Sequence, residues 1–228
     1  MGTPDQERHV PVPVSSGRTD LDDYNVISMS LQKHLVIFAK APRMGRVKTR
    51  LARDIGGVRA WGFYRHALAG LVQRLSSDPR WQTYLAVAPD TACEHTGVWP
   101  AGATRFPQGL GDLGDRMHRA FERMPPGPVV IIGADIPDIQ PHHIHGAFKK
   151  LGHHDAVFGP ADDGGYWLVG QKRFPRTRTI FSNVRWSGPH ALEDTCANLP
   201  GARIGYLETL IDVDDGDDYK RWTGNYAR

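Results

Sequence analysis

Aspartates stand at the ends of three apolar runs of this sequence. Asp135 follows the run VVII, the pair Asp162 and Asp163 precedes two glycines, and Asp212 and Asp214 form an Asp-x-Asp motif after a short predicted strand. Magnesium and manganese prefer carboxylate oxygens as ligands, and the carboxyl ends of parallel strands meet at one edge of a sheet. Any one of these motifs could be a turn or a helix cap, but the three together predict a divalent cation site.

A strongly basic loop is the second candidate for chemistry. The stretch FAKAPRMGRVKTRL begins in an apolar run, contains Pro42 and Gly45, and enters a predicted helix. Five cations lie within eleven residues, at Lys40, Arg43, Arg46, Lys48 and Arg50. They repel one another and lie near the positive end of the helix dipole. We therefore favour a loop that binds phosphate over a solvated basic turn.

Hydrophobic periodicity indicates the elements that must position these residues. Short apolar runs predict strands, and apolar residues at spacings of three and four predict helices. Strands are expected at residues 35–39, 83–88, 129–132, 156–158, 166–169 and 203–207, and helices at 51–75, 112–124, 141–151, 189–199 and 215–222. A break in the first helix is expected near Gly56 and Gly57. Because strands alternate with helices, the sequence predicts an α/β domain with a mostly parallel sheet.

Composition narrows the possible settings and partners. The chain has 228 residues and a net charge of +3, a mild excess that does not indicate a nucleic-acid partner. Its two cysteines, Cys93 and Cys196, form no CxxC pair, so we expect a reduced, cytoplasmic setting. No apolar stretch approaches the length of a membrane span, and we expect no membrane partner. Residues 1–30 lack periodicity and contain several prolines, which predicts a flexible N-terminal extension.

Three further motifs match known sites by letter only. The glycines of 109–114 fit GxGxxG, but no apolar strand directly precedes them, and we interpret the stretch as a loop in which Asp112 caps the next helix. Lys48 and Thr49 resemble the end of a P-loop, but Val47 replaces the required glycine. Histidines cluster around one predicted helix, at His142, His143, His145, His153 and His154. With no cysteine nearby, we favour a structural or solvated role for them over a zinc site.

The order of the motifs resembles that of a known family. The stretches FAKAPRMGRVKTRL, QGLGDLGDRM, VVIIGADIPDI, FGPADDGGYWLVG, FSNVRWS and IDVDDGDD occur in this order across residues 34–220. Together they are similar to a bacterial and archaeal family within the nucleotide-diphospho-sugar transferase superfamily, whose members are often named glycosyltransferases. The first loop is also similar to that of 2-phospho-lactate guanylyltransferase. The resemblance implies a GT-A-like, three-layer α/β/α sandwich that forms one nucleotide-binding transferase domain over residues 31–228.

The resemblance also implies roles for individual residues. Asp135, Asp212 and Asp214 would hold Mg²⁺ or Mn²⁺. The basic loop would meet the phosphates of the nucleotide through Lys40, Arg43, Gly45, Lys48 and Arg50. The acceptor pocket would be formed by Asp162, Gly164, Gly165, Tyr166, Trp186 and Ser187. Family members commonly show Trp-Ser-Thr, whereas this chain has Gly188 after Ser187 and lacks one hydroxyl group.

Two reactions fit these roles. In a glycosyltransferase, a hydroxyl group of the acceptor attacks a nucleotide sugar, and Asp163 would act as the general base beside the metal-binding Asp135. In a nucleotidyltransferase, a phosphorylated acceptor attacks a nucleoside triphosphate and pyrophosphate leaves. We favour sugar transfer to a small-molecule acceptor, because the acidic 162–165 turn would repel a phosphate group. A non-catalytic nucleotide-binding module with a regulatory role is the third alternative.

Overall fold

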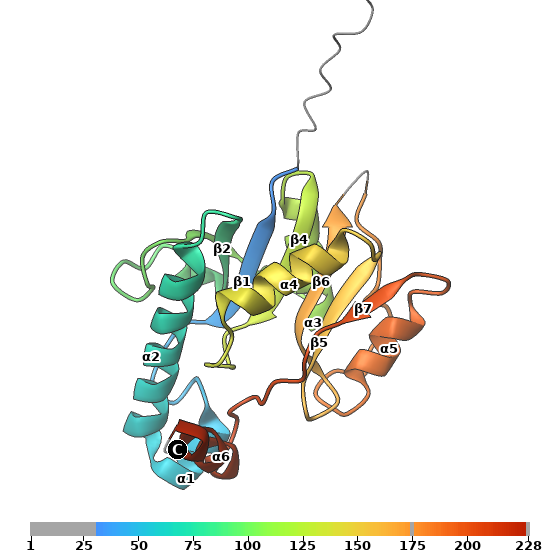
Figure 1. The fold of residues 1–228 in the computed structure, drawn as a ribbon. Helices are drawn as coiled ribbons and strands as arrows, with labels where there is room; N and C mark the ends of the chain where they lie inside the picture. The colour runs from blue at the N-terminus through green and yellow to red at the C-terminus, as the bar shows by residue number, and fades with distance from the viewer. Residues whose placement is uncertain (1–30, 174–175, 227–228) are drawn as a thin grey trace, which may run out of the picture. The chain divides into compact units, whose positions relative to one another are not determined.

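The chain folds around a seven-stranded sheet (Figure 1). The computed structural model describes residues 31–173 and 176–226, so the extension expected at residues 1–30 lies outside the described residues. The strands are ordered β3-β2-β1-β4-β6-β5-β7. They are β1 (His34–Lys40), β2 (Gln82–Ala88), β3 (Thr104–Pro107), β4 (Gly127–Gly133), β5 (Ala156–Pro160), β6 (Tyr166–Arg173) and β7 (Ile204–Tyr206). Neighbouring strands are parallel except where β6 is involved, which confirms the mostly parallel sheet predicted from the sequence.

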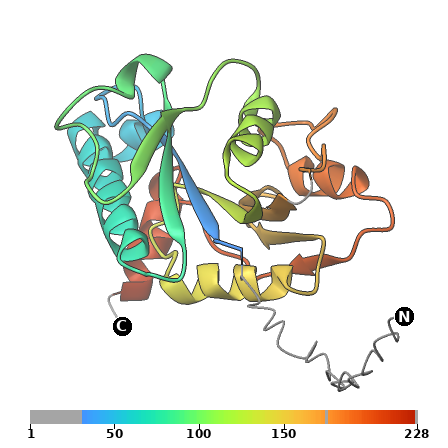
Figure 2. The same cartoon turned by 90° about the horizontal axis from the view of Figure 1, so that it is seen from above.

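Helices cover both faces of this sheet. They are α1 (Thr49–Ile55), α2 (Gly57–Ser76), α3 (Leu113–Arg123), α4 (Pro141–Leu151), α5 (Ala191–Ala197) and α6 (Gly216–Tyr226), with a short 3₁₀ helix η1 (Asp90–Ala92). Residues of α2 and α4 belong to the hydrophobic core on one face, and residues of α3 and α5 pack in the core on the other. Figure 2 shows α4 and α3 on opposite sides of the sheet. This arrangement is the three-layer α/β/α sandwich that the resemblance implied.

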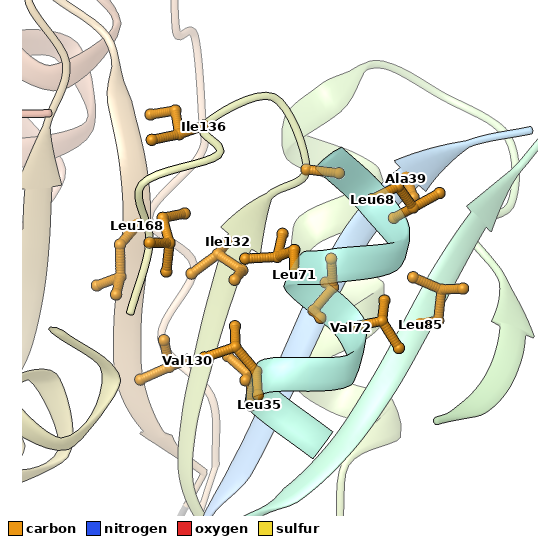
Figure 3. Close-up of a cluster of buried hydrophobic side chains, with 14 of the residues drawn as sticks. Leu35, Ala39, Leu68, Leu71, Val72, Leu85, Val130, Ile132, Ile136 and Leu168 are labelled. Carbon is orange, nitrogen blue, oxygen red and sulfur yellow. The ribbon is translucent and has the colours of Figure 1, made fainter. Parts of the chain in front are cut away.

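Alternation along the strands explains why two cores form. Successive side chains of a strand point to opposite faces of the sheet. Leu35 and Ile37 of β1 therefore pack in one core, whereas Val36 packs in the other. Figure 3 shows the first core, where Leu71 and Val72 of α2 lie over the strands. The apolar residues that fix the sheet between its helices are thus those that the sequence pattern identified.

The structure confirms one detail of the sequence-based expectation and differs from it at another. The expected break in the first helix is found: α1 ends at Ile55 and α2 begins at Gly57. Gly56 between them has φ 88°, in the left-handed region that glycine adopts readily. Strand β3 was not expected, because among its four residues only Phe106 is buried and a single apolar residue shows no period. Among the helices that the structure describes, none is long and apolar enough to cross a bilayer.

The topology brings the candidate residues to one edge of the sheet. Strands β1 and β4 are parallel neighbours, and Phe38 pairs with Gly133 near their carboxyl ends. The basic loop after β1 and Asp135 after β4 therefore start side by side. Further along the edge, Ala161 forms an isolated parallel bridge with Leu210. This bridge places the chain that leads to Asp212 beside the turn that follows β5.

Candidate active site

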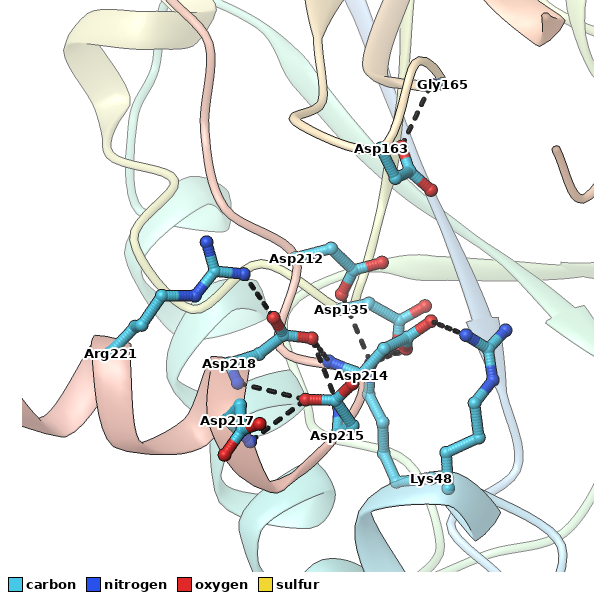
Figure 4. Close-up of polar contacts among 11 residues, drawn as sticks. Lys48, Asp135, Asp163, Gly165, Asp212, Asp214, Asp215, Asp217, Asp218 and Arg221 are labelled. Carbon is cyan, nitrogen blue, oxygen red and sulfur yellow. Dashed lines mark hydrogen bonds and ion pairs between the residues drawn. The ribbon is translucent and has the colours of Figure 1, made fainter. Parts of the chain in front are cut away.

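The ammonium group of Lys48 lies among three carboxylates (Figure 4). Its Nζ atom is 2.9 Å from Asp135 Oδ1, 3.3 Å from Asp212 Oδ1 and 2.8 Å from Asp214 Oδ1. The Lys48 side chain is only 4% exposed, whereas Asp135 is 46% exposed. The three aspartates that were predicted to bind metal therefore lie next to Lys48, which was predicted to bind phosphate. Both roles stay predictions, but the four side chains form one cluster.

Charge in this cluster is unbalanced. Three carboxylates surround one buried ammonium group, and the Arg50 guanidinium reaches Asp214 only at 3.5 Å. Burial alone would lower the pKa of Lys48, but Asp135, Asp212 and Asp214 outweigh burial and raise that pKa. Burial raises the pKa of the Asp212 carboxyl, and Asp135 and Asp214 add to this rise although Lys48 opposes it. A second cation would therefore stabilise the ionised form of the cluster.

The donor atoms of the cluster fit a hard divalent cation. All three are carboxylate oxygens, one from the loop after β4 and two from the 212–214 segment, and they converge on one cationic atom. Mg²⁺ and Mn²⁺ prefer such oxygen ligands, whereas zinc usually takes nitrogen and sulfur. The residues present therefore fit the metal that the sequence predicted, at the position of the lysine ammonium.

The loop that carries Lys48 is held by α2. The Tyr64 hydroxyl accepts a hydrogen bond from the Lys40 N–H and donates one to the Lys40 carbonyl, both at 2.9 Å. Trp61 Nε1 donates to the Pro42 carbonyl at 2.6 Å. Lys48 itself has φ 46°, a left-handed conformation that costs a residue with a β-carbon about 1–2 kcal/mol. Such strain persists where the surroundings over-determine the backbone, here at the residue that reaches the carboxylates.

The aspartates of the 212–218 segment divide into two groups. Asp215 Oδ1 accepts hydrogen bonds from the N–H groups of Asp217 and Asp218, both at 3.0 Å. Asp218 Oδ2 accepts from the N–H groups of Asp214 and Asp215, at 3.0 and 3.2 Å. These bonds cap the N-terminus of α6 and satisfy its free amides. The capping fixes the backbone so that Asp212 and Asp214 can face Lys48.

A cavity of about 410 Å³ opens beside the carboxylate cluster. We call it the basic cavity, because its lining includes Lys40, Arg46, Lys48, Arg50 and Arg116. Three of the five predicted phosphate-binding residues, Lys40, Lys48 and Arg50, therefore line it. Arg43 and Gly45 do not: Arg43 lies within 3.2 Å of His95 Nδ1 on the surface, and Gly45 adopts φ 73° in the preceding turn.

Gln108 is a lining residue of the basic cavity that the sequence analysis did not identify. Its side-chain NH₂ group donates to the carbonyls of Ala86 and Ala39, at 2.9 and 3.4 Å. Both partners can only accept, so the orientation of the amide is determined by its neighbours. The side-chain oxygen is left for another hydrogen bond, in a residue that is otherwise buried.

A second cavity of about 260 Å³ adjoins the first. We call it the acidic cavity, because its charged lining residues are Asp135, Asp163 and Asp212. The rest of the lining is largely apolar and aromatic, and includes Phe38, Met117, Ile131, Tyr166, Trp167 and Trp186. Asp135 and Asp212 line both cavities. The two cavities therefore meet at the carboxylate cluster.

Most of the predicted acceptor residues line the acidic cavity. They are Gly165, Tyr166, Trp186 and Ser187, and the predicted general base Asp163 lines the same cavity. Asp162 does not line it and instead pairs with Arg221 of α6, with 3.2 Å between Oδ2 and the guanidinium. Gly164 does not line it either, and a β-carbon there would come within 2.3 Å of the Pro189 carbonyl oxygen. Only glycine permits that approach, and its φ of 85° also favours glycine.

The polar groups of the acidic cavity have defined partners. Asp163 Oδ1 accepts a hydrogen bond from the Gly165 N–H at 2.9 Å, so its second oxygen is available to a ligand. The Tyr166 hydroxyl lies 3.4 Å from Thr195 Oγ1, and burial raises the pKa of Tyr166 so that it stays neutral. Ser187 has φ 63°, another strained residue in the wall of the site.

An ion pair holds the loop that carries Trp186 and Ser187. Arg185 Nε donates to Asp194 Oδ2 at 2.9 Å, and the guanidinium also reaches Asp194 Oδ1 at 2.7 Å. These hydrogen bonds lower the pKa of Asp194 to about 2. The bidentate geometry fixes both the position and the plane of the guanidinium, and so ties this loop to α5.

The contacts of His143 indicate a structural role for this member of the histidine cluster. His142, His143 and Glu208 place possible ligand atoms within 4.8 Å of one another. However, His143 Nδ1 accepts a hydrogen bond from the Gln140 N–H at 2.9 Å, so the proton of the neutral ring is on Nε2. That proton points to Glu208 Oε1, 3.0 Å away. A metal needs the Nε2 lone pair, which this tautomer does not offer, so the structural role favoured from the sequence is the better interpretation.

The GxGxxG stretch contributes to the site in a way the sequence analysis missed. Asp112 caps α3 as predicted, because its Oδ1 accepts from the Asp115 N–H at 2.8 Å. The preceding loop is pinned by Arg119, which donates to the carbonyls of Gln108 and Leu110 at 2.8 and 3.0 Å. This loop and α3 bring Gln108 and Arg116 to the basic cavity. The glycine-rich loop before a capped helix could have been recognised from the sequence. However, strand β3 was not predicted, so the sequence did not show that this loop follows a strand at the edge of the sheet where the site lies.

The fold is found in other solved structures. A candidate nucleotide-diphospho-sugar transferase from Desulfovibrio desulfuricans G20 is 28% identical, with a TM-score of 0.76 over 86% of this chain and 88% of that one. The 4-diphosphocytidyl-2C-methyl-D-erythritol synthase from Anaerococcus prevotii DSM 20548 is 10% identical, with a TM-score of 0.60 over 86% and 96%. The Rv0371c protein of Mycobacterium tuberculosis H37Rv, solved with manganese, is 19% identical, with a TM-score of 0.50 over 84% and 97%. The last two similarities concern the fold alone.

Sequence comparison gives the family. No protein of curated function matches this chain at a significant level. The model of a family described as "uncharacterized protein conserved in bacteria (DUF2064)" matches residues 71–188, which is more than half of the chain. The chain therefore belongs to the DUF2064 family and has the fold of the nucleotide-diphospho-sugar transferase superfamily, as the order of its motifs implied.

Proposed function

We propose that this protein is a metal-dependent transferase that moves a sugar from a nucleotide sugar to a hydroxyl group of a small acceptor without a phosphate. The division of charge between the two cavities carries this proposal. Among the described residues that line them, the lysines and arginines all line the basic cavity, whereas the acidic cavity has three aspartates and no basic side chain. The shared residues Asp135 and Asp212 mark where the two substrates would meet.

The basic cavity suits the anionic part of the donor. Lys40, Arg46 and Arg116 can form charge-assisted hydrogen bonds to a diphosphate group. The side-chain oxygen of Gln108 can accept a hydrogen bond from an N–H group of a nucleobase. A donor held in this way would place its diphosphate beside the carboxylate cluster.

Asp135, Asp212 and Asp214 would hold the divalent ion. When bound, Mg²⁺ or Mn²⁺ would neutralise charge on the diphosphate that leaves the sugar. The capping of α6 holds Asp212 and Asp214 in place, and the end of β4 holds Asp135. The three aspartates thus lie in short segments next to β4 and α6, and these elements limit the movement of the ligands, which helps to position a reacting group.

The acidic cavity suits an acceptor with an apolar face and a free hydroxyl group. The aromatic rings of Tyr166 and Trp186 would contact the apolar face. The carboxylate of Asp163 would take the proton of the acceptor hydroxyl as its oxygen bonds to the anomeric carbon. The bond from that carbon to the diphosphate oxygen breaks in the same reaction, so the nucleoside diphosphate leaves as an anion.

Nucleotidyl transfer is the second candidate. The five basic residues of the basic cavity provide enough positive charge for a triphosphate, which favours this reaction. Its acceptor carries a phosphate group, which would have to enter a cavity lined by three aspartates. That repulsion is the reason for placing sugar transfer first.

Product analysis separates the candidates. The protein would be incubated with Mn²⁺, a panel of nucleotide sugars and nucleoside triphosphates, and a broad acceptor mixture, with products read by mass spectrometry. A glycosylated product together with nucleoside diphosphate supports the proposal. Pyrophosphate from a triphosphate, with nucleotide sugars inert, would replace it by nucleotidyl transfer. Stabilisation by nucleotides of about 2.7 kcal/mol at a hundredfold excess over the dissociation constant, without any turnover, would point to a binding module.

A further inference from the structure

We propose that Lys48 is a tethered counter-ion of the metal-binding carboxylates, and that a divalent ion must displace its ammonium group in order to bind. The Nζ atom is within 3.3 Å of one carboxylate oxygen each from Asp135, Asp212 and Asp214. No other described side chain forms an ion pair with all three. The ammonium therefore occupies the point on which the predicted metal ligands converge.

The two cations cannot share this point. Mg²⁺ lies about 2.0–2.1 Å from its oxygen ligands, which is closer than the 2.8–3.3 Å of the ammonium contacts. An ion bound to these oxygens would lie within a few ångströms of Nζ, where two positive charges repel strongly in a partly buried site. Binding of the metal therefore requires the lysine head group to leave.

Lys48 can leave without moving the backbone. Its neighbours Val47 and Leu51 are buried in the core, so the start of α1 is anchored. The side chain is a flexible four-carbon stem with a compact charge at its tip, and it lines the basic cavity. Rotation of the stem would carry the ammonium from the carboxylates into that cavity, where the phosphates of the donor would lie.

Such a displacement would couple the metal to the donor. Before the metal binds, Lys48 holds the three carboxylates together and reduces their mutual repulsion. After it binds, the released ammonium is available to phosphate. Lys48 is then a positioning residue that makes metal and nucleotide binding mutually favourable, which reconciles its contacts here with the phosphate role predicted from the sequence.

The first test measures Mn²⁺ affinity by electron paramagnetic resonance, without nucleotide and without activity. Lys48→Met keeps an apolar stem and removes the charge. Because the ammonium no longer competes with the metal, the Mn²⁺ dissociation constant should fall about tenfold, which is a usual size for the coupling between two binding events. Lys149→Met is the matched control, because it removes the same charge at an exposed residue of α4 that lines neither cavity. The control should change by less than about twofold, because an exposed charge is screened by water and salt. An unchanged or higher dissociation constant in Lys48→Met would overturn the proposal.

A second test uses the unaltered chain and holds even if Lys48→Met does not fold. Acylation of lysines by acetic anhydride would be followed by peptide mass spectrometry, with and without Mg²⁺. Without Mg²⁺, Lys48 should react slowly, because its amine is buried and paired with three carboxylates. With Mg²⁺, it should react several-fold faster. Lys149, exposed on α4, should react equally in both. Equal labelling of Lys48 in both conditions would overturn the proposal.

This inference rests on the metal role in the proposed function, and the outcomes separate the two. If neither wild type nor Lys48→Met binds Mn²⁺, the metal dependence of the proposed function fails, and the role of Lys48 fails with it. If both bind Mn²⁺ with equal affinity, only the role of Lys48 fails. Neither measurement depends on whether the transferred group is a sugar or a nucleotide.

Discussion

The indole N–H of Trp222 donates a hydrogen bond to Oδ1 of Asp138, at 2.9 Å. Trp222 belongs to α6, which follows the 212–214 segment, and Asp138 lies shortly after Asp135. The bond therefore joins, from outside the cavity, the two parts of the chain that carry the carboxylate cluster. The Trp222 ring also packs edge-on against Phe63 of α2, with 5.3 Å between ring centroids.

Trp222→Phe keeps an aromatic ring against Phe63 and removes the donor. We expect the free energy of unfolding to fall by about 1–2 kcal/mol, because a charged acceptor loses a hydrogen bond. Mn²⁺ should also bind more weakly, since Asp135 is less well aligned with Asp212. Urea denaturation and Mn²⁺ titration measure these effects, and Trp222→Ala should be less stable still. Identical values for Trp222→Phe and wild type would show that the bond contributes nothing.

The adjacent aspartates of the 162–165 turn provide a matched pair. Asp163→Asn should reduce turnover by about 10²–10⁴-fold and leave donor binding nearly intact, as expected for the loss of a general base. Asp162→Asn removes the same charge at a residue that pairs with Arg221 outside the cavity, so its effect on turnover should be much smaller. Initial rates measure turnover in both variants, and titration with the donor measures its binding. Equal losses of rate would remove Asp163 from the proposed role.

Arg46 and Arg43 provide a second pair in the basic loop. Arg46→Glu should weaken nucleoside diphosphate binding much more than nucleoside binding, because Arg46 lines the basic cavity and a phosphate contact is ionic. The weakening should shrink at high salt, where ionic contacts are screened. Arg43→Glu alters a residue beside His95 that does not line the cavity, so it should matter less. Calorimetric titration with both ligands checks this, and an equal loss for nucleoside and diphosphate would contradict it.

Asp135→Asn tests the metal site. We expect metal-dependent nucleotide binding to be lost, because the amide oxygen carries no charge to attract a divalent ion. The free energy of unfolding should change little, since Asp135 is 46% exposed. Asp217→Asn is the control, because Asp217 is 88% exposed and pairs with Lys220 on the outer surface of α6. Nucleotide binding in the presence and absence of Mg²⁺ is measured for both, and metal-dependent binding that survives in Asp135→Asn would refute the assignment.

His34 makes stability depend on pH. It is 1% exposed, and neither ring nitrogen has a hydrogen-bond partner among the residues that the structure describes. Burial lowers the pKa of His34, and Arg173 adds to this effect, so the folded chain keeps the ring neutral. Below about pH 6.5 the unfolded chain binds a proton that the folded chain does not. The free energy of unfolding should therefore be steady above that pH and decline below it.

Urea denaturation at about pH 8 and about pH 5.5, on either side of the ordinary histidine pKa, measures the decline. His34→Leu places an apolar residue in the same buried position and should show a shallower decline. An equally steep decline in the variant would assign the pH dependence to other groups.

The sequence predicts the strands and helices well where the polarity of each residue indicates whether its side chain is buried. Leu35, Val36 and Ile37 are all apolar because successive side chains enter two cores, and this continuous apolar run predicted a buried strand. The position of Asp135 at the end of β4 follows from the same pattern. By contrast, the contact of Lys48 with Asp135 depends on the direction of a long side chain, which no local pattern states. Gln108 was missed for a related reason, since its role depends on carbonyls of two neighbouring strands.

Lys48 and Asp214 are separated by 166 positions, and all the strands after β1 are synthesised between them. At typical ribosomal rates of about 5–20 residues per second, the lysine precedes its last counter-charge by roughly 8–33 s. During that interval Asp135 is the only one of its three carboxylate partners already made, so the Lys48 ammonium gains less from burial, although Val47 and Leu51 can already pack. Among the described residues, Val213 is the only buried apolar residue after position 212. A chain cut before that position would therefore keep nearly all of its apolar core, yet its lysine would lack two of its three counter-charges. The apolar core and the ion cluster would thus be completed at different stages of synthesis.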